Sequence, residues 1–332
     1  MKEFIKKILF FGAFCGIFMT AIPIAIDPYN VFHADAIRDN GIEQNSNYIK
    51  MKYILENPDK FDAFLFGSSR VGSIHTENIQ DVTCYNMTYS EGLPQEHLDN
   101  LKTLVANGII PKRVYMGVDS LSYTLSPRDH QTDHSRISYE YAKENPIDFL
   151  SLYLDPHMAL QSLETTKNNV PEDNYTERFY NWGWWCDYGV ETTINKENAP
   201  TRIGTHILMD EVLDTIAEMS DICEENGIEF IVFTNPMHYI VYYDSGDAYF
   251  EFLEKLADVT GYYNFSGLNE ITLRHVNYVD TSHYNAETGD LMLEFMSGNI
   301  PDQALYEEGF GLYVTPENID DFLVLLEEQF PD

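Results

Sequence analysis

The sequence predicts an α/β domain with a three-layer αβα arrangement, in which a parallel sheet lies between two layers of helices. Short apolar runs of the kind that form buried strands alternate with amphipathic stretches of helical spacing. The joins between them are short, which favours right-handed crossovers between parallel strands. At 332 residues and 44% hydrophobic content, the chain can bury a sizeable core.

The predicted strands and helices follow one another in a regular order. Strands are expected over 61–67, 112–119 and 228–236, with a short fourth strand over 262–267. Helices are expected over 94–108, 205–227 and 247–261, and two of them stop at a glycine, Gly108 and Gly227. The tail, 299–332, contains one more amphipathic helix, which we expect to pack on the domain and close it.

The N-terminus contains a segment suited to a membrane. Three lysines (Lys2, Lys6 and Lys7) precede the uncharged stretch ILFFGAFCGIFMTAIPIAI, residues 8–26. A helix over this stretch is about 28 Å long, close to the thickness of the hydrocarbon core. Lysines on its N-terminal side predict a cytoplasmic N-terminus and an extracytoplasmic remainder. A cleaved signal peptide is the alternative, disfavoured by the length of the apolar stretch and the lack of a clean A-x-A site.

These signals define an expected domain organisation. Residues 1–29 form a cytoplasmic tip and signal-anchor, 30–298 the α/β domain, and 299–332 a helical extension. The strand-helix rhythm is lost over about 122–204, which we interpret as an insertion or lid packed over the sheet edge. It contains the three tryptophans Trp182, Trp184 and Trp185, which either stack on sugar rings or form a local core.

The charge of the chain argues against nucleic acid as a partner. The sequence has 54 Asp and Glu against 20 Lys and Arg, a formal net charge of -34. Most of such a surface repels phosphate backbones and anionic headgroups. We therefore expect a folded acidic protein whose membrane contact is made through the N-terminal helix.

Polar residues follow the predicted strands at their carboxyl ends, where ligands bind in open parallel sheets. Gly67-Ser68-Ser69-Arg70 follows the first strand, Asp119-Ser120 the second, and His238 stands just beyond the third. A serine hydroxyl becomes a nucleophile when a neutral imidazole takes its proton and a carboxylate orients that imidazole. Asp280 and His283, three residues apart and just ahead of a helix expected from Ala286, can supply both groups.

Two further histidine patterns offer alternatives, one for the base and one for a metal site. His238 is an alternative base, but His283 is favoured because it has a carboxylate at fixed spacing, and His238 is then expected to orient the bound substrate. His130 and His134 are spaced i, i+4 beside Asp129 and Asp133, as in a divalent-metal clip. A solvated loop is favoured there, because the spacing identifies no third ligand. We expect no metal site and no cofactor.

The order of these motifs resembles the SGNH (GDSL-type) hydrolase superfamily: strand, G-x-S turn, and a distant D-x-x-H before a C-terminal helix. The Gly67-Ser68-Ser69-Arg70 variant, together with an N-terminal anchor, is similar to exported acyl-transfer proteins such as the alginate O-acetyltransferase group and the D-alanyl transfer protein of teichoic acid modification. The resemblance implies that Ser69 is the nucleophile, His283 the base and Asp280 the orienting acid. It also implies a membrane-bound O-acyltransferase partner.

The resemblance further implies an oxyanion hole made by the N–H groups of Ser69 and Gly92. Ser68 stands where the GDSL pattern has Asp. The sequence departs from the family at the third block, where G-x-N-D becomes Gly117-Val118-Asp119-Ser120. An ionised Asp119 would repel an oxyanion, so either its carboxylate turns away or Ser120 donates instead.

The expected function is that of an exported, membrane-anchored serine acyl-transfer enzyme. It would move an acyl group, such as acetyl, between an acyl donor and a cell-surface polysaccharide, as an O-acetyltransferase or as an esterase. A second hypothesis of another class is a non-catalytic glycan-binding or assembly protein on a degenerate hydrolase fold. Asp119 in place of Asn and the aromatic insertion motivate that alternative.

Overall fold

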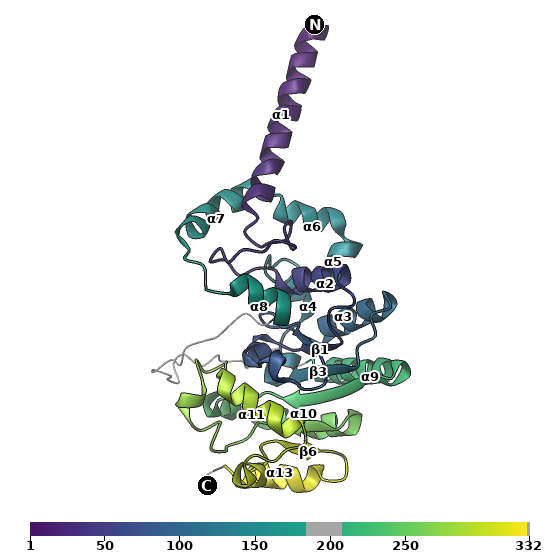
Figure 1. Cartoon of the computed structure of the whole chain (residues 1–332), viewed down its shortest axis with the longest axis vertical. Coiled ribbons are helices and arrows are strands. Elements are labelled where there is room, and N and C mark those ends of the chain that lie inside the picture. The colour runs from purple at the N-terminus through teal and green to yellow at the C-terminus, as the bar shows by residue number, and fades with distance from the viewer. Residues whose placement is uncertain (184–207, 331–332) are drawn as a thin grey trace. The chain divides into compact units, whose positions relative to one another are not determined.

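A computed structural model describes residues 1–183 and 208–330, and it confirms an α/β protein with a mostly parallel sheet (Figure 1). Within these described residues the sheet has six strands, in the order β2-β1-β3-β4-β5-β6. The strands are β1 (Ala63–Phe66), β2 (Cys84–Asn86), β3 (Arg113–Val118), β4 (Glu229–Thr234), β5 (Tyr262–Asn264) and β6 (Leu312–Val314). Every neighbouring pair is parallel except β5 and β6, which are antiparallel.

The four predicted strands are all present, and the sheet has two more. β1, β3, β4 and β5 lie inside the predicted ranges, and β1 is buried along its whole length, as expected of a parallel strand covered on both faces. The additional strands β2 and β6 have 3 residues each. A run that short shows too little alternation to be recognised from the sequence.

The helices alternate with the strands through the C-terminal half of the chain. The α-helices are α1 (Lys2–Ile26), α2 (Ser46–Glu56), α3 (Pro94–Ala106), α4 (Pro127–His130), α5 (Tyr139–Glu144), α6 (Pro146–Tyr153), α7 (Pro156–Asn168), α8 (Tyr175–Trp182), α9 (Met209–Asn226), α10 (Tyr239–Val259), α11 (Ala286–Met296), α12 (Gln303–Glu307) and α13 (Ile319–Glu328). Short 3-10 turns are η1 (Ser69–Ser73), η2 (Thr76–Asn78), η3 (Ser120–Tyr123) and η5 (His275–Asn277). α10 begins earlier than predicted and is interrupted at Gly246, whose φ of 55° is non-helical.

Helices pack against both faces of the sheet. On one face, Leu65 and Tyr115 share a core with Phe295 of α11. On the other, the ring of Phe66 stacks on His97 of α3, with the ring centroids 4.9 Å apart. Each apolar side chain of this size that is fully buried stabilises the fold by about 1.5–3 kcal/mol. This packing fixes the strand ends from which the candidate site is built.

The chain divides into two compact units. One consists of residues 1–53 and 130–177, and the other of 54–129 and 178–332. The first unit contains α1 together with α5, α6 and α7, which come from the expected insertion. The second unit contains all six strands.

α1 is the one described helix that is long and apolar enough to cross a membrane. Only 6% of its apolar window is buried within the structure. The helix is capped at its C-terminus by Asp27, which has a φ of 41°. The Asp27 carboxylate accepts hydrogen bonds from the backbone N–H groups of Val31, Phe32 and His33. The segment after the helix is therefore ordered by a buried carboxylate.

The histidine pair of the possible metal clip lies inside the first unit and not in a solvated loop. His130 is 2% exposed, and the ring of His134 stacks on Tyr29 with the centroids 5.2 Å apart. The expectation of a solvated loop is therefore wrong, because His130 is buried and the ring of His134 packs on Tyr29. No group of three His, Cys, Asp or Glu side chains that could hold a metal ion occurs among residues 1–183 and 208–330.

The expected aromatic cluster falls only partly within the structure. Trp182 ends α8, and its carbonyl accepts a hydrogen bond from Thr76 Oγ1 at 3.3 Å. Trp184 and Trp185 lie outside the described residues. The choice between sugar stacking and a local core therefore stays a prediction.

Candidate active site

The end of β1 delivers Ser69 to a tight turn. Gly67 follows the strand with a φ of 150°, where a Cβ would lie 2.9 Å from Val71 Cγ1, so the turn requires glycine. Ser68 precedes η1 and its side chain accepts a hydrogen bond from the N–H of Arg70 at 3.4 Å. Ser69 is the first residue of η1 and is partly exposed, whereas Ser68 is buried. Ser68 thus shapes the turn and Ser69 presents its hydroxyl.

The structure brings Ser69, His283 and Asp280 together in one hydrogen-bonded row. Ser69 Oγ lies 2.8 Å from His283 Nε2. On the other side of the ring, His283 Nδ1 lies 2.9 Å from Asp280 Oδ2 and 3.0 Å from Oδ1. The carboxylate accepts a hydrogen bond from the Nδ1–H group, which leaves the Nε2 lone pair facing the serine hydroxyl. These are the contacts that nucleophile activation by a triad requires.

Asp280 is held as an anion by its own loop. Burial alone would raise the pKa of the Asp280 carboxyl. The hydrogen bond and charge of His283, together with the N–H groups of Ser282 and His283, lower the pKa by more than burial raises it, so the net pKa lies below its ordinary value. The two N–H groups donate to Asp280 Oδ1 at 2.6 and 2.8 Å. The D-x-x-H spacing therefore gives a closed local loop in which the acid binds both the ring and the backbone of its histidine.

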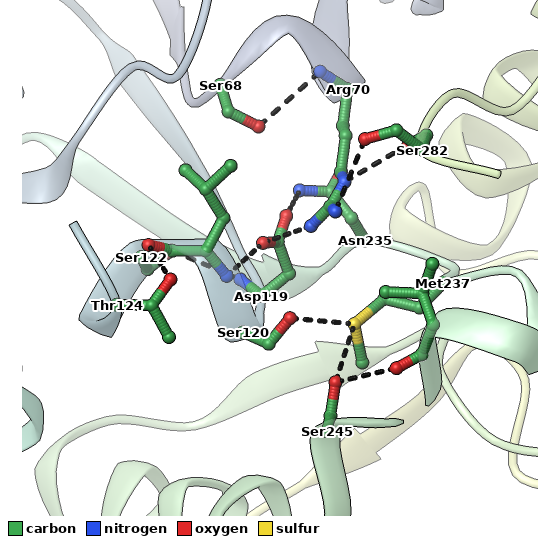
Figure 2. Close-up of polar contacts among 12 residues, drawn as sticks. Ser68, Arg70, Asp119, Ser120, Ser122, Thr124, Asn235, Met237, Ser245 and Ser282 are labelled. Carbon is green, nitrogen blue, oxygen red and sulfur yellow. Dashed lines mark hydrogen bonds and ion pairs between the residues drawn. The ribbon is translucent and has the colours of Figure 1, made fainter. Parts of the chain in front are cut away.

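A buried ion pair lies next to the serine turn. The guanidinium of Arg70 and the carboxylate of Asp119 form this pair, and both side chains are 2% exposed (Figure 2). Burial acts to raise the pKa of the Asp119 carboxyl, but Arg70, the N–H of Leu121 and the amide of Asn235 hold the pKa below its ordinary value. Asp119 is therefore ionised, and of the two sequence alternatives its carboxylate turns toward Arg70.

The Arg70 side chain also reaches the loop of the acid and base. Its Nε donates to the carbonyl of Ser282 at 3.1 Å, and its Nη2 to the Ser282 hydroxyl at 3.4 Å (Figure 2). Arg70 is 1% exposed. The position of Arg70 at the strand end allowed a contact with substrate, but its donors serve neighbouring protein groups and support the site.

Two of the predicted oxyanion donors, the Gly92 N–H and the Ser120 hydroxyl, have protein partners in this structure. Gly92 lies against the serine turn, because a Cβ there would be 2.5 Å from the Gly67 carbonyl oxygen, but its N–H donates to the carbonyl of Tyr89 at 3.1 Å. Ser120 Oγ donates to Met237 Sδ at 3.4 Å (Figure 2). Ser69 N–H, at the start of a 3-10 turn, is the remaining predicted donor, since the first N–H groups of a helical turn have no partner within it.

His238 takes part in a different arrangement. Its Nε2 lies 2.8 Å from His275 Nδ1, and its Nδ1 accepts from the N–H of Ile240 at 3.3 Å, which caps α10. Burial, with the nearby His275, lowers the pKa of His238 to about 4. Between the two candidate bases, the structure places His283, and not His238, on the serine hydroxyl.

Sequence reasoning gave no role to three residues of this site: Asn235, Ser282 and Tyr284. Asn235 Nδ2 donates to Asp119 Oδ2 at 2.9 Å, and its Oδ1 accepts from the Tyr284 hydroxyl at 3.2 Å. The available signals were weak: Asn235 directly follows β4, and the other two flank His283.

Comparison with known proteins adds no assignment: no protein-family model and no curated protein matches the chain. The resemblance to the SGNH superfamily therefore stays a prediction from the sequence motifs.

Proposed function

We propose that this protein is a membrane-anchored, extracytoplasmic serine acyl-transfer enzyme of SGNH type that acts on a cell-surface polysaccharide. The observation that carries the proposal is the 2.8 Å contact between Ser69 Oγ and His283 Nε2, with Asp280 on the far nitrogen of the ring. The apolar α1 and the lysines in its first two turns support the anchor and the extracytoplasmic side.

The reaction follows from the order of the three side chains. His283 Nε2 takes the proton of Ser69 as the serine oxygen attacks the ester carbonyl, and Asp280 stabilises the imidazolium that forms. The Ser69 N–H donates to the developing oxyanion; a donor of this kind contributes about 3 kcal/mol in well-studied cases. Collapse releases the donor alcohol, protonated by His283, and leaves an acyl-Ser69. A sugar hydroxyl or water, deprotonated by His283, then attacks the acyl carbon; the bond to Ser69 Oγ breaks, and His283 returns the proton to the serine.

A measurement with an activated acetyl ester tests this proposal. Full-length protein in detergent micelles is mixed with p-nitrophenyl acetate, and the acetylated peptide is identified by mass spectrometry. We expect acetyl on Ser69, its loss in Ser69→Ala, and its retention in the matched variant Ser68→Ala, because Ser68 caps the turn and does not face His283. If the protein is a transferase, added acceptor oligosaccharides should increase turnover of the ester and become acetylated. If it is an esterase, turnover should stay the same and no acetylated sugar should form.

Two contacts favour the second candidate, a non-catalytic glycan-binding or assembly protein. The Asp119 carboxylate is committed to a buried ion pair, and the Gly92 N–H is bonded to Tyr89, so both are occupied in this structure. Absence of any acetyl-Ser69 in a folded protein that still binds polysaccharide would replace the enzyme proposal with this one.

A further inference from the structure

Three adjacent strand ends supply a row of polar groups beneath the loop that carries His283. Arg70 follows β1, Asp119 follows β3 and Asn235 follows β4, and these strands are neighbours in the sheet. The Asp119 carboxylate joins the row, because its Oδ1 pairs with Arg70 and its Oδ2 accepts from Asn235.

This row holds the histidine loop at two positions, one on each side of His283. Arg70 binds the carbonyl and the hydroxyl of Ser282, the residue before the histidine. Asn235 binds the hydroxyl of Tyr284, the residue after it. Tyr284 is 0% exposed, so this end of the loop is fixed inside the protein.

We propose that Asp119 is a positioning residue that fixes His283 against Ser69 through two arms, Arg70 on Ser282 and Asn235 on Tyr284. The role depends on the proposed function, since the position of His283 matters for chemistry only if it activates Ser69. This positioning role explains why Asp119 stands where the family pattern has Asn. A carboxylate offers two acceptor oxygens and compensates the buried Arg70 charge, whereas an Asn would offer one oxygen and leave that charge unpaired.

Arg70 is the residue directly after Ser69 in η1, so the Arg70 arm joins the serine turn to the histidine loop. If this arm is removed, the loop can shift relative to the turn, which changes the distance between Ser69 Oγ and His283 Nε2. Misplacement by about 1 Å can cost about a hundredfold in rate.

Two variants test the arms without leaving a charge alone in the interior. Tyr284→Phe removes only the hydroxyl that binds Asn235. The double variant Arg70→Met/Asp119→Leu removes both charges together, since a buried pair replaced by apolar groups of similar size is often tolerated. The matched control is Tyr262→Phe, which removes a buried hydroxyl that donates to the Leu253 carbonyl at 3.1 Å, away from this loop.

Two readouts on the full-length protein in detergent micelles separate positioning from general stability. The first is the rate at which a fluorophosphonate probe labels Ser69. The second is amide hydrogen exchange over 278–285, where Val279, Ser282, His283 and Asn285 donate hydrogen bonds within or next to the loop. We expect labelling to slow about tenfold in Tyr284→Phe and about a hundredfold in the double variant. In both variants, amide exchange should accelerate over 278–285 while β1 and β3 stay protected. The Tyr262→Phe control should be labelled at a rate within about threefold of that of the unmutated protein.

The outcomes distinguish this inference from the proposed function. Labelling of the unmutated protein, with variants that label equally fast, would overturn the positioning role and leave the enzyme proposal intact. If the unmutated protein is not labelled, the enzyme proposal fails, and the hydrogen exchange alone decides whether the arms hold the loop. Faster exchange throughout the sheet would show a merely structural role and overturn the inference.

Discussion

Ser69 Oγ and His283 Nε2 lie 2.8 Å apart, although the two residues are separated by 214 positions in the sequence. Ser69 lies three residues after the end of β1, the first strand of the second unit, and His283 lies just before α11. A contact between such distant segments depends on the fold, and it is the relationship on which the proposed chemistry depends.

Asp280 should matter far more for the reaction than for stability. Asp280→Asn keeps the shape of the side chain but allows the wrong tautomer of His283, and we expect kcat for p-nitrophenyl acetate to fall about 10³–10⁴-fold. The Asp280 side chain is 45% exposed, so the melting temperature should change little. The matched control is Asp290→Asn, which breaks a similar contact between Asp290 Oδ2 and His75 Nδ1, 3.1 Å apart, outside the triad. Equal losses in both variants would contradict the triad assignment.

His238 should make the protein sensitive to mild acid. Its pKa in the folded state is about 4, whereas an unfolded histidine has a pKa of about 6.5, so the unfolded state binds the proton first as pH falls. The stability due to neutral His238 is complete above about pH 6.5 and is lost between about 6.5 and 4, by on the order of 3 kcal/mol. Urea unfolding across this range measures the loss.

The matched variants for this prediction are His238→Asn and His157→Asn. The first retains a capping acceptor for the N–H of Ile240 and removes the titrating ring, so its stability should vary less between pH 6.5 and 4. The second changes an exposed histidine and should keep the slope of the unmutated protein. The same slope in all three proteins would mean that His238 is not its origin.

The close approach of Gly92 to the serine turn should make this position intolerant of a side chain. A Cβ there would lie 2.5 Å from the backbone oxygen of Gly67, which cannot move without displacing the end of β1. We expect Gly92→Ala to lower the free energy of unfolding by about 1–3 kcal/mol and to slow acylation of Ser69. At Gly72 in the same turn a Cβ would meet Thr88 Cγ2 at 3.7 Å, an ordinary contact. Gly72→Ala should therefore be tolerated, and a similar loss there would refute the steric argument.

The N-terminal helix should remain attached to the mature protein. Asp27 is 1% exposed and its carboxylate binds three backbone N–H groups, so the chain folds immediately after α1 and offers no extended segment there for cleavage. Intact mass of protein isolated from membranes should include residues 1–26, and a variant lacking residues 2–26 should be released by alkaline carbonate. A mature N-terminus within or just after α1 would support the signal-peptide alternative.

The sequence was sufficient for the parts of the site that depend on local pattern. The run from β1 into Gly67-Ser68-Ser69 and the Asp280-x-x-His283 spacing are each contained in a few residues, and parallel strands bring their ends to one edge. The contact of Asp119 with Arg70 and Asn235 could not be predicted in the same way. It joins the ends of three strands, and nothing in the local sequence around Asp119 shows which cation balances its charge.

The most direct test of the central claim is to label the full-length protein, in detergent micelles, with a fluorophosphonate probe and map the modified peptide. The probe reacts with serines whose hydroxyl is activated by a base. We predict an adduct on Ser69 that is lost in His283→Ala and kept in His238→Asn. A folded protein without an adduct on Ser69, or an adduct that persists in His283→Ala, would contradict the account.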